Sequence, residues 1–170
     1  MQSDYPSDKI QIFLGLDNCT DSTKSIIESK FSTDNIKVIE FTERQGKPNV
    51  LNQIIEKQIS NDDSILILTD ANVIFTKTTI FELIKYFKDE QIGLVDSTIK
   101  AQVSTNKNEM DYWDYETDIK QHESLVYGII PGPSGACYAI RRNLYSTVPA
   151  NFHMKAWYTE LFPVLLVLVM

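Results

Sequence analysis

The segment ILILTDAN, residues 65–72, most constrains what this chain can fold into. Residues 65–68 are apolar without a break, which is typical of a strand buried on both faces of a sheet. Thr69, Asp70 and Asn72 follow directly, at the carboxyl end of the strand, where open α/β sheets bind their ligands. The segment therefore predicts one of two things. Either Asp70 and Asn72 supply oxygen ligands for Mg²⁺ or Mn²⁺, or the strand simply ends in an Asx turn.

Length and charge limit the class of protein. The chain has 170 residues, which is enough for one domain with a real core. Its net charge of −7 and the lack of a Lys/Arg-rich run argue against a nucleic-acid partner. Cys19 and Cys137 lie far apart, which fits a reducing compartment better than a disulfide framework or a zinc site. The polar N-terminus shows no signal peptide, so we expect a cytoplasmic location.

Strand and helix patterns alternate along the chain. Strands are expected at 10–16, 36–41, 65–68, 92–99 and 136–141, and helices at about 20–31, from 48, from 79 and at 109–126. This alternation predicts an α/β domain with a mostly parallel sheet and helices on both of its faces. The polar loops 17–23, 42–47 and 70–72 would then open on one edge of the sheet.

The expected helix at 109–126 carries an apolar stripe. Tyr112, Tyr115, Ile119 and Val126 recur at intervals of three, four and seven, and His122 falls on the same stripe. We therefore interpret His122 as a packed or hydrogen-bonded residue at the edge of the core rather than as a catalyst.

The C-terminal segment LFPVLLVLVM, residues 161–170, is apolar throughout. It is too short to cross a bilayer, which takes about 20 residues. It is either a buried terminal element or the beginning of a membrane span, and an apolar free end favours the second alternative. We accordingly expect a domain at 1–152 and an apolar tail at 153–170 that associates with the cytoplasmic face of a membrane.

Four segments, in this order, resemble motifs of one enzyme family. DNCTDST at 17–23 is similar to D-x-S-T-D-x-T, RQGKPNVLN at 44–52 to R-x-G-K-x-x-A-L-N, and TDAN at 69–72 to the D-x-D metal motif. YWDYE at 112–116 with GPSGACYAIRR at 132–142 is similar to the acceptor-side stretch of polysaccharide synthases. The chain thus resembles the inverting glycosyltransferases of family two, which have the GT-A fold.

The resemblance implies a Rossmann-like three-layer fold and a UDP-sugar donor. Asp17 would hydrogen-bond the uracil ring, and Lys47 and Arg44 would lie near the diphosphate, where positive charge is favourable. Asp70 would lie near the ribose and the metal.

The resemblance also implies a metal and an acceptor. Asn72 would join Asp70 in binding Mn²⁺ or Mg²⁺, although a neutral amide stands here in place of the family's second carboxylate. Gly135 and Ala136 would shape the pocket for the sugar and for a saccharide or lipid acceptor. A carboxylate base would deprotonate the acceptor hydroxyl, which attacks the anomeric carbon with inversion.

Two family features are missing from the sequence. No apolar strand with a P-x-Y-N-E-like end precedes residues 10–16, and the acidic pair that carries the catalytic base does not follow residues 148–152. We therefore expect a truncated or internally deleted domain whose sheet lacks its first strand, and whose transfer activity is impaired. The catalytic base is left unassigned. The alternatives are a nucleotide-binding module without catalysis and a plain α/β interaction or regulatory domain.

Overall fold

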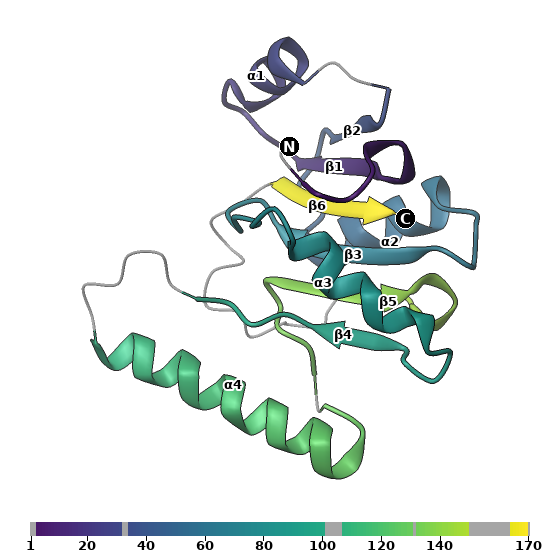
Figure 1. The fold of residues 1–170 in the computed structure, drawn as a ribbon. Coiled ribbons are helices and arrows are strands. Elements are labelled where there is room, and N and C mark those ends of the chain that lie inside the picture. Colours follow the sequence, from purple (N-terminus) through teal and green to yellow (C-terminus); the bar gives the residue numbers. More distant parts are fainter. Residues whose placement is uncertain (1–2, 32–33, 101–106, 131, 150–163, 170) are drawn as a thin grey trace.

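Strands and helices alternate in the computed structural model, which describes residues 3–31, 34–100, 107–130, 132–149 and 164–169 (Figure 1). The strands are Gln11–Asp17 (β1), Ile36–Phe41 (β2), Ile65–Asp70 (β3), Leu94–Asp96 (β4), Cys137–Arg141 (β5) and Val164–Val169 (β6). The α-helices are Thr23–Lys30 (α1), Lys47–Gln58 (α2), Thr79–Ile84 (α3) and Lys107–Tyr127 (α4), and the 3₁₀ helices are Ser7–Lys9 (η1), Lys85–Lys88 (η2) and Arg142–Leu144 (η3). The sequence-based elements are confirmed, with end points that differ by a few residues.

The sheet is mixed, and the prediction of a mostly parallel sheet was wrong for the strand pairings. Its strand order is β2-β1-β6-β3-β5-β4, in which only β1 and β2 are parallel neighbours. The other four pairings are antiparallel, so β1 to β4 run in one direction while β5 and β6 run in the other. The alternating pattern correctly predicts that β1 to β4 run in the same direction. Their carboxyl ends therefore lie at one edge of the sheet.

The tail contributes a strand to the middle of the sheet. Leu166 pairs with Leu14 of β1 on one side and with Thr69 of β3 on the other. We expected a sheet without its first strand to close up or expose an inner edge, and this was wrong, because β6 fills that place between β1 and β3 (Figure 1). Hydrogen bonds to β1 on one side and to β3 on the other pair the backbone N–H and C=O groups of this apolar segment.

Among the helices that the structure describes, none is long and apolar enough to span a membrane. Association of the tail with a membrane stays a prediction.

Two helical layers cover the two faces of the sheet. On β3, Leu66 and Leu68 point to the face covered by α2, whereas Ile67 points to the face covered by α3. All three are at most 2% exposed, which confirms a strand buried on both faces. The α2 side consists of Phe13, Val50, Leu51, Ile54, Ile55, Ile59, Leu66 and Leu68. The α3 side consists of Ile10, Ile12, Ile67, Ile80, Leu83, Phe87, Cys137 and Ala139. The fold is therefore the predicted three-layer α/β/α sandwich.

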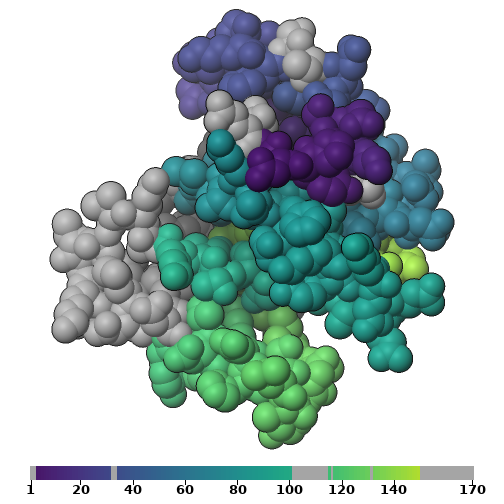
Figure 2. Space-filling view, in the orientation of Figure 1, coloured from purple at the N-terminus to yellow at the C-terminus, as the bar shows by residue number. Residues whose placement is uncertain are grey.

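The N-terminal segment packs beside the start of α3. The backbone N–H of Asp4 donates to the carbonyl of Lys77 at 3.0 Å. Figure 2 shows this segment, in purple, adjoining the teal atoms of the α3 region on the near face of the molecule.

Helix α4 lies apart from the helices that cover the sheet (Figure 1). Tyr115, Ile119 and Val126 are 40–69% exposed, so this part of the apolar stripe does not pack on the core. His122 is also exposed, and its Nδ1 lies 2.7 Å from the carbonyl oxygen of Asp118. The hydrogen-bonded alternative for His122 is confirmed, but its placement at the edge of the core was wrong. The side chain of Tyr112 lies outside the described residues.

Candidate functional site

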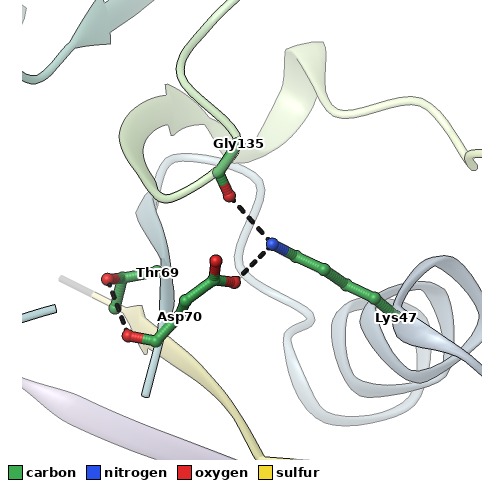
Figure 3. A network of polar contacts seen from close by, with 4 residues as sticks. All are labelled: Lys47, Thr69, Asp70 and Gly135. Atoms are coloured by element: carbon green, nitrogen blue, oxygen red, sulfur yellow. Dashed lines mark hydrogen bonds and ion pairs between the residues drawn. The ribbon is translucent and has the colours of Figure 1, made fainter. Parts of the chain in front are cut away.

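Lys47, Asp70 and Gly135 meet at the carboxyl edge of the sheet (Figure 3). Asp70 is the last residue of β3, and Lys47 is the first residue of α2. The Lys47 ammonium forms a salt bridge with Asp70 Oδ1 and donates a hydrogen bond to the Gly135 carbonyl oxygen at 2.8 Å. The two charged side chains are only 14% and 21% exposed. Three of the residues that the resemblance selected are thus brought into one contact.

The start of α2 determines where Lys47 lies. Gly46 precedes the helix with φ of +78°, a conformation that disfavours any residue with a Cβ. Pro48 sits in the first turn, where its missing N–H costs no hydrogen bond. A lysine at a helix N-terminus is electrostatically unfavourable. Asp70 offsets this by placing a carboxylate against the Lys47 ammonium.

Asp17, at the end of β1, holds the loop before α2. Its two carboxylate oxygens accept hydrogen bonds from the backbone N–H groups of Gln45 at 2.6 Å and of Gly46 at 2.9 Å. These two residues directly precede Lys47, so Asp17 fixes the loop from which that side chain extends. The predicted contact of Asp17 with uracil stays a prediction, and each carboxylate oxygen has a second lone pair for it.

The segment before β5 forms the other side of the site. The Ala136 carbonyl accepts a hydrogen bond from the Asp70 backbone N–H at 2.9 Å, and the Gly135 carbonyl accepts one from Lys47. Thr69, which is 2% exposed, donates from its hydroxyl to the Asp70 carbonyl at 3.2 Å (Figure 3). Gly135 and Ala136 therefore lie against Asp70 through their backbones. Their role toward a sugar or an acceptor stays a prediction.

Arg44 and Asn72 are exposed and lie in loops at this edge. Arg44 belongs to the loop between β2 and α2. Asn72 lies in a turn that closes when the Val73 N–H donates to the Asp70 carbonyl at 3.2 Å. A turn does follow the strand, but it is closed by a backbone hydrogen bond, whereas the predicted Asx turn is closed by a side-chain oxygen. The same backbone positions the Asp70 carboxylate in the site.

The donor groups do not fit a divalent-metal site built by the protein. Among the described residues, no group of three or more His, Cys, Asp or Glu side chains could hold a metal ion. Asp70 Oδ1 is engaged by the Lys47 ammonium, and Asn72 offers only a neutral amide. Mg²⁺ is bound by one or two carboxylates together with substrate phosphates and waters. A single carboxylate already paired with a cation falls short of this.

A second carboxylate, Asp96, ends β4 at the same edge, and its role was not predicted from the sequence. Asp96 Oδ1 accepts backbone hydrogen bonds from Ser97 at 2.9 Å and Ser134 at 2.8 Å, and Oδ2 lies 3.5 Å from Lys120 Nζ of α4. Burial raises the pKa of the Asp96 carboxyl, and these contacts oppose the rise. Asp96 therefore ties α4 and the 132–135 segment to the sheet. Its position inside the expected strand 92–99 gave no signal of this role.

The motif residue Asn52 acts as a buried clamp. It is 7% exposed, and its amide donates to the Val148 carbonyl at 2.7 Å. Its carbonyl oxygen accepts from the Val148 N–H at 3.0 Å and from the Tyr145 hydroxyl at 2.9 Å. Burial raises the pKa of the Tyr145 phenol, which keeps it protonated as a donor. Asn52 thus ties the segment after β5 to α2.

The two cysteines, Cys19 and Cys137, are not joined in a disulfide. Burial raises the pKa of Cys19, with further increases from nearby carboxylates, and raises that of Cys137 to about 11. Both remain protonated near neutral pH, so neither is an activated nucleophile.

The family model described as Glycosyl transferase family 2 matches residues 2–148, a span that includes every residue of the site above. Searches of curated proteins and of solved structures gave no match.

Proposed function

The chain belongs to glycosyl transferase family 2, and on this premise we propose that its carboxyl edge binds the nucleotide of a UDP-sugar. The observation that carries the proposal is the contact of Lys47 with Asp70 and Gly135. A partly buried ammonium at the edge where α/β sheets bind ligands suits a diphosphate, because hydrogen bonds between charged groups are strong. In this proposal Lys47 contacts the diphosphate. Asp17 lies toward the nucleoside, and Arg44 lies toward the phosphates.

The proposed reaction is transfer of the sugar to a saccharide or lipid hydroxyl with inversion. The acceptor oxygen forms a bond to the anomeric carbon as the bond from that carbon to the diphosphate oxygen breaks. UDP leaves with the bonding electron pair, and its charge is stabilised by Lys47. The acceptor proton must pass to a base.

The three carboxylates that end β1, β3 and β4 are each engaged by other groups. Asp17 is held by two backbone N–H groups, Asp70 by Lys47, and Asp96 by two backbone N–H groups and Lys120. We therefore propose that transfer is slow and that nucleotide binding is the stronger property. The same observation favours the alternative of a nucleotide-binding domain without catalysis.

Metal and membrane are not needed for this proposal. Members of the family often use a divalent metal. Because the donor groups at Asp70 and Asn72 do not fit one, no step above depends on Mn²⁺ or Mg²⁺. Gly135 and Ala136 are proposed to border the sugar and acceptor. Attachment to the cytoplasmic face of a membrane is proposed only for the part of the tail that precedes β6.

The proposal is tested by two measurements on the full chain. Titration calorimetry with UDP and with ADP should show heat of binding for UDP that is weaker or absent for ADP. Product analysis with radiolabelled UDP-glucose or UDP-N-acetylglucosamine and a saccharide acceptor should show little or no transfer. A folded chain that fails to bind UDP would refute the nucleotide site. Rapid transfer would refute the proposed lack of a base.

A further inference from the structure

We infer that Lys47 stands in for the divalent metal at this site, so that the chain binds a nucleoside diphosphate without a metal ion. This inference rests on the proposed function and concerns the chemistry of the same site. The resemblance to the family implies a metal between Asp70 and the diphosphate. The structure places the Lys47 ammonium against Asp70 instead (Figure 3).

The contacts of Lys47 leave it able to take a phosphate. An ammonium group has three N–H donors. In the part of the chain that the structure describes, Asp70 and the Gly135 carbonyl take two of them. The third remains for a phosphate oxygen. The two existing contacts hold the side chain in one orientation, which lowers the entropy cost of binding.

The location of Lys47 strengthens the attraction between its ammonium group and a phosphate. Its side chain is 14% exposed, so water and salt screen the ammonium less than they would at the surface. It also sits at the N-terminus of the 12-residue helix α2, where the backbone dipoles favour an anion. Asp70 balances the ammonium in the free chain, and a diphosphate would add the anion that this positive end of α2 favours.

The same contacts disfavour a metal. A divalent ion that binds Asp70 would have to displace Lys47 from it or accept a lysine at close range, and both are unfavourable because like charges repel. The only other predicted ligand, Asn72, is exposed and neutral. Removing the Lys47 charge should therefore free Asp70 for a metal, so that nucleotide binding becomes metal-dependent.

The test is calorimetry of the full chain with UDP, in EDTA and in Mn²⁺, for the wild type and three variants. Wild type should bind UDP in EDTA, and Mn²⁺ should change its Kd by less than about threefold. Lys47→Met should bind UDP about 10- to 100-fold more weakly in EDTA, the loss of one charge-assisted contact, and should regain affinity in Mn²⁺. Lys85→Met is the matched control, because Lys85 also loses a salt bridge, that with Glu82 in the α3–η2 region. It should bind like wild type.

Asp70→Asn separates the two chemistries, because it removes the predicted metal ligand and keeps the Lys47 ammonium. It should bind UDP in EDTA better than Lys47→Met does. Electron paramagnetic resonance of Mn²⁺ gives a readout without activity: the bound signal in the presence of UDP should be stronger for Lys47→Met than for wild type.

Each contrary result has one meaning. UDP binding by wild type that is lost in EDTA and restored by Mn²⁺ would overturn the inference and leave the proposed function intact. Equal binding by Lys47→Met and Lys85→Met in EDTA would overturn the role of Lys47. A folded wild type that binds no UDP under either condition would overturn the proposed function and the inference together. Circular dichroism verifies folding in every case.

Discussion

Replacing Asp17 by asparagine should destabilise the fold and weaken UDP binding together. Asp17 accepts hydrogen bonds from the Gln45 and Gly46 N–H groups on its two oxygens. Asparagine keeps one oxygen and turns an NH₂ group toward the other N–H, which loses its acceptor. Hydrogen bonds to a charged group contribute about 1.5–3 kcal/mol each. Because Asp17 is only partly buried, we take the lower end of that range, about 1.5 kcal/mol, for the lost bond and about 0.5 kcal/mol for the weakening of the bond that remains.

The expected loss in the free energy of unfolding is about 2 kcal/mol. For a domain of this length, about 1 kcal/mol shifts Tm by roughly 2–4 °C, so Tm should fall by about 4–8 °C. The loop that carries Lys47 would lose its anchor, and the Kd for UDP should rise about tenfold, which corresponds to about 1.4 kcal/mol. Thermal unfolding by circular dichroism and UDP calorimetry measure the two effects.

Asp21→Asn is the control for Asp17→Asn, because it removes the same charge from the same loop. Asp21 is exposed and accepts one backbone hydrogen bond, from Thr23 at 3.0 Å. Its Tm and its affinity for UDP should stay close to those of the wild type. If the two variants have the same Tm, the hydrogen bonds of Asp17 do not hold the loop, and the reasoning is refuted. If Asp17→Asn loses affinity for UDP without loss of Tm, Asp17 contacts the nucleotide directly instead of positioning Lys47.

Three further changes test other parts of the structure. Asn52→Leu leaves the Val148 and Tyr145 partners unpaired and should lower the free energy of unfolding by about 2–4 kcal/mol in urea; a loss below about 1 kcal/mol would contradict the clamp. Burial raises the pKa of Asp96 in the folded chain, so the folded state retains this proton to higher pH than the unfolded state does. The contribution of Asp96 to stability therefore falls as pH rises from about 4 through that raised pKa. Asp96→Asn should lack this fall when Tm is measured from pH 4 to 7, and parallel profiles would refute the assignment. Leu166→Pro removes a backbone N–H from a strand paired on both sides and should cost about 2–3 kcal/mol, whereas an unchanged Tm would show that the segment is not in the sheet.

The sequence predicts the frame of the site because the frame depends on local patterns. The apolar run 65–68 indicates a buried strand, and Pro48 indicates the first turn of a helix. Once parallel strands are expected, their carboxyl ends must share an edge, which brings Asp17, Lys47 and Asp70 near one another. The pairing of Lys47 with Asp70 was not predicted, since the resemblance suggested a metal at that place.

The sequence does not predict the parts that depend on distant partners. The run of apolar residues at 164–169 has no period that separates a strand from a helix, so its place between β1 and β3 follows only from the backbone groups that those strands leave to pair. Asp96 lies within an expected strand, and its burial depends on Ser134 and Lys120, which are far along the chain. The apolar stripe of α4 predicts packing, yet Tyr115 and Val126 are exposed.

The most direct test of the nucleotide site is to locate bound UDP on the chain. A ¹⁵N-labelled sample of this 19.5 kDa protein is titrated with UDP in EDTA, and amide chemical shifts are followed by NMR. The account predicts that the largest changes fall on Gly46, Lys47 and Gly135 at the carboxyl edge. The pocket that Ile10 and Asn35 help to line, at the amino ends of β1 and β2, should not respond. Changes centred on that pocket, or saturating UDP without any change at the carboxyl edge, would contradict the account.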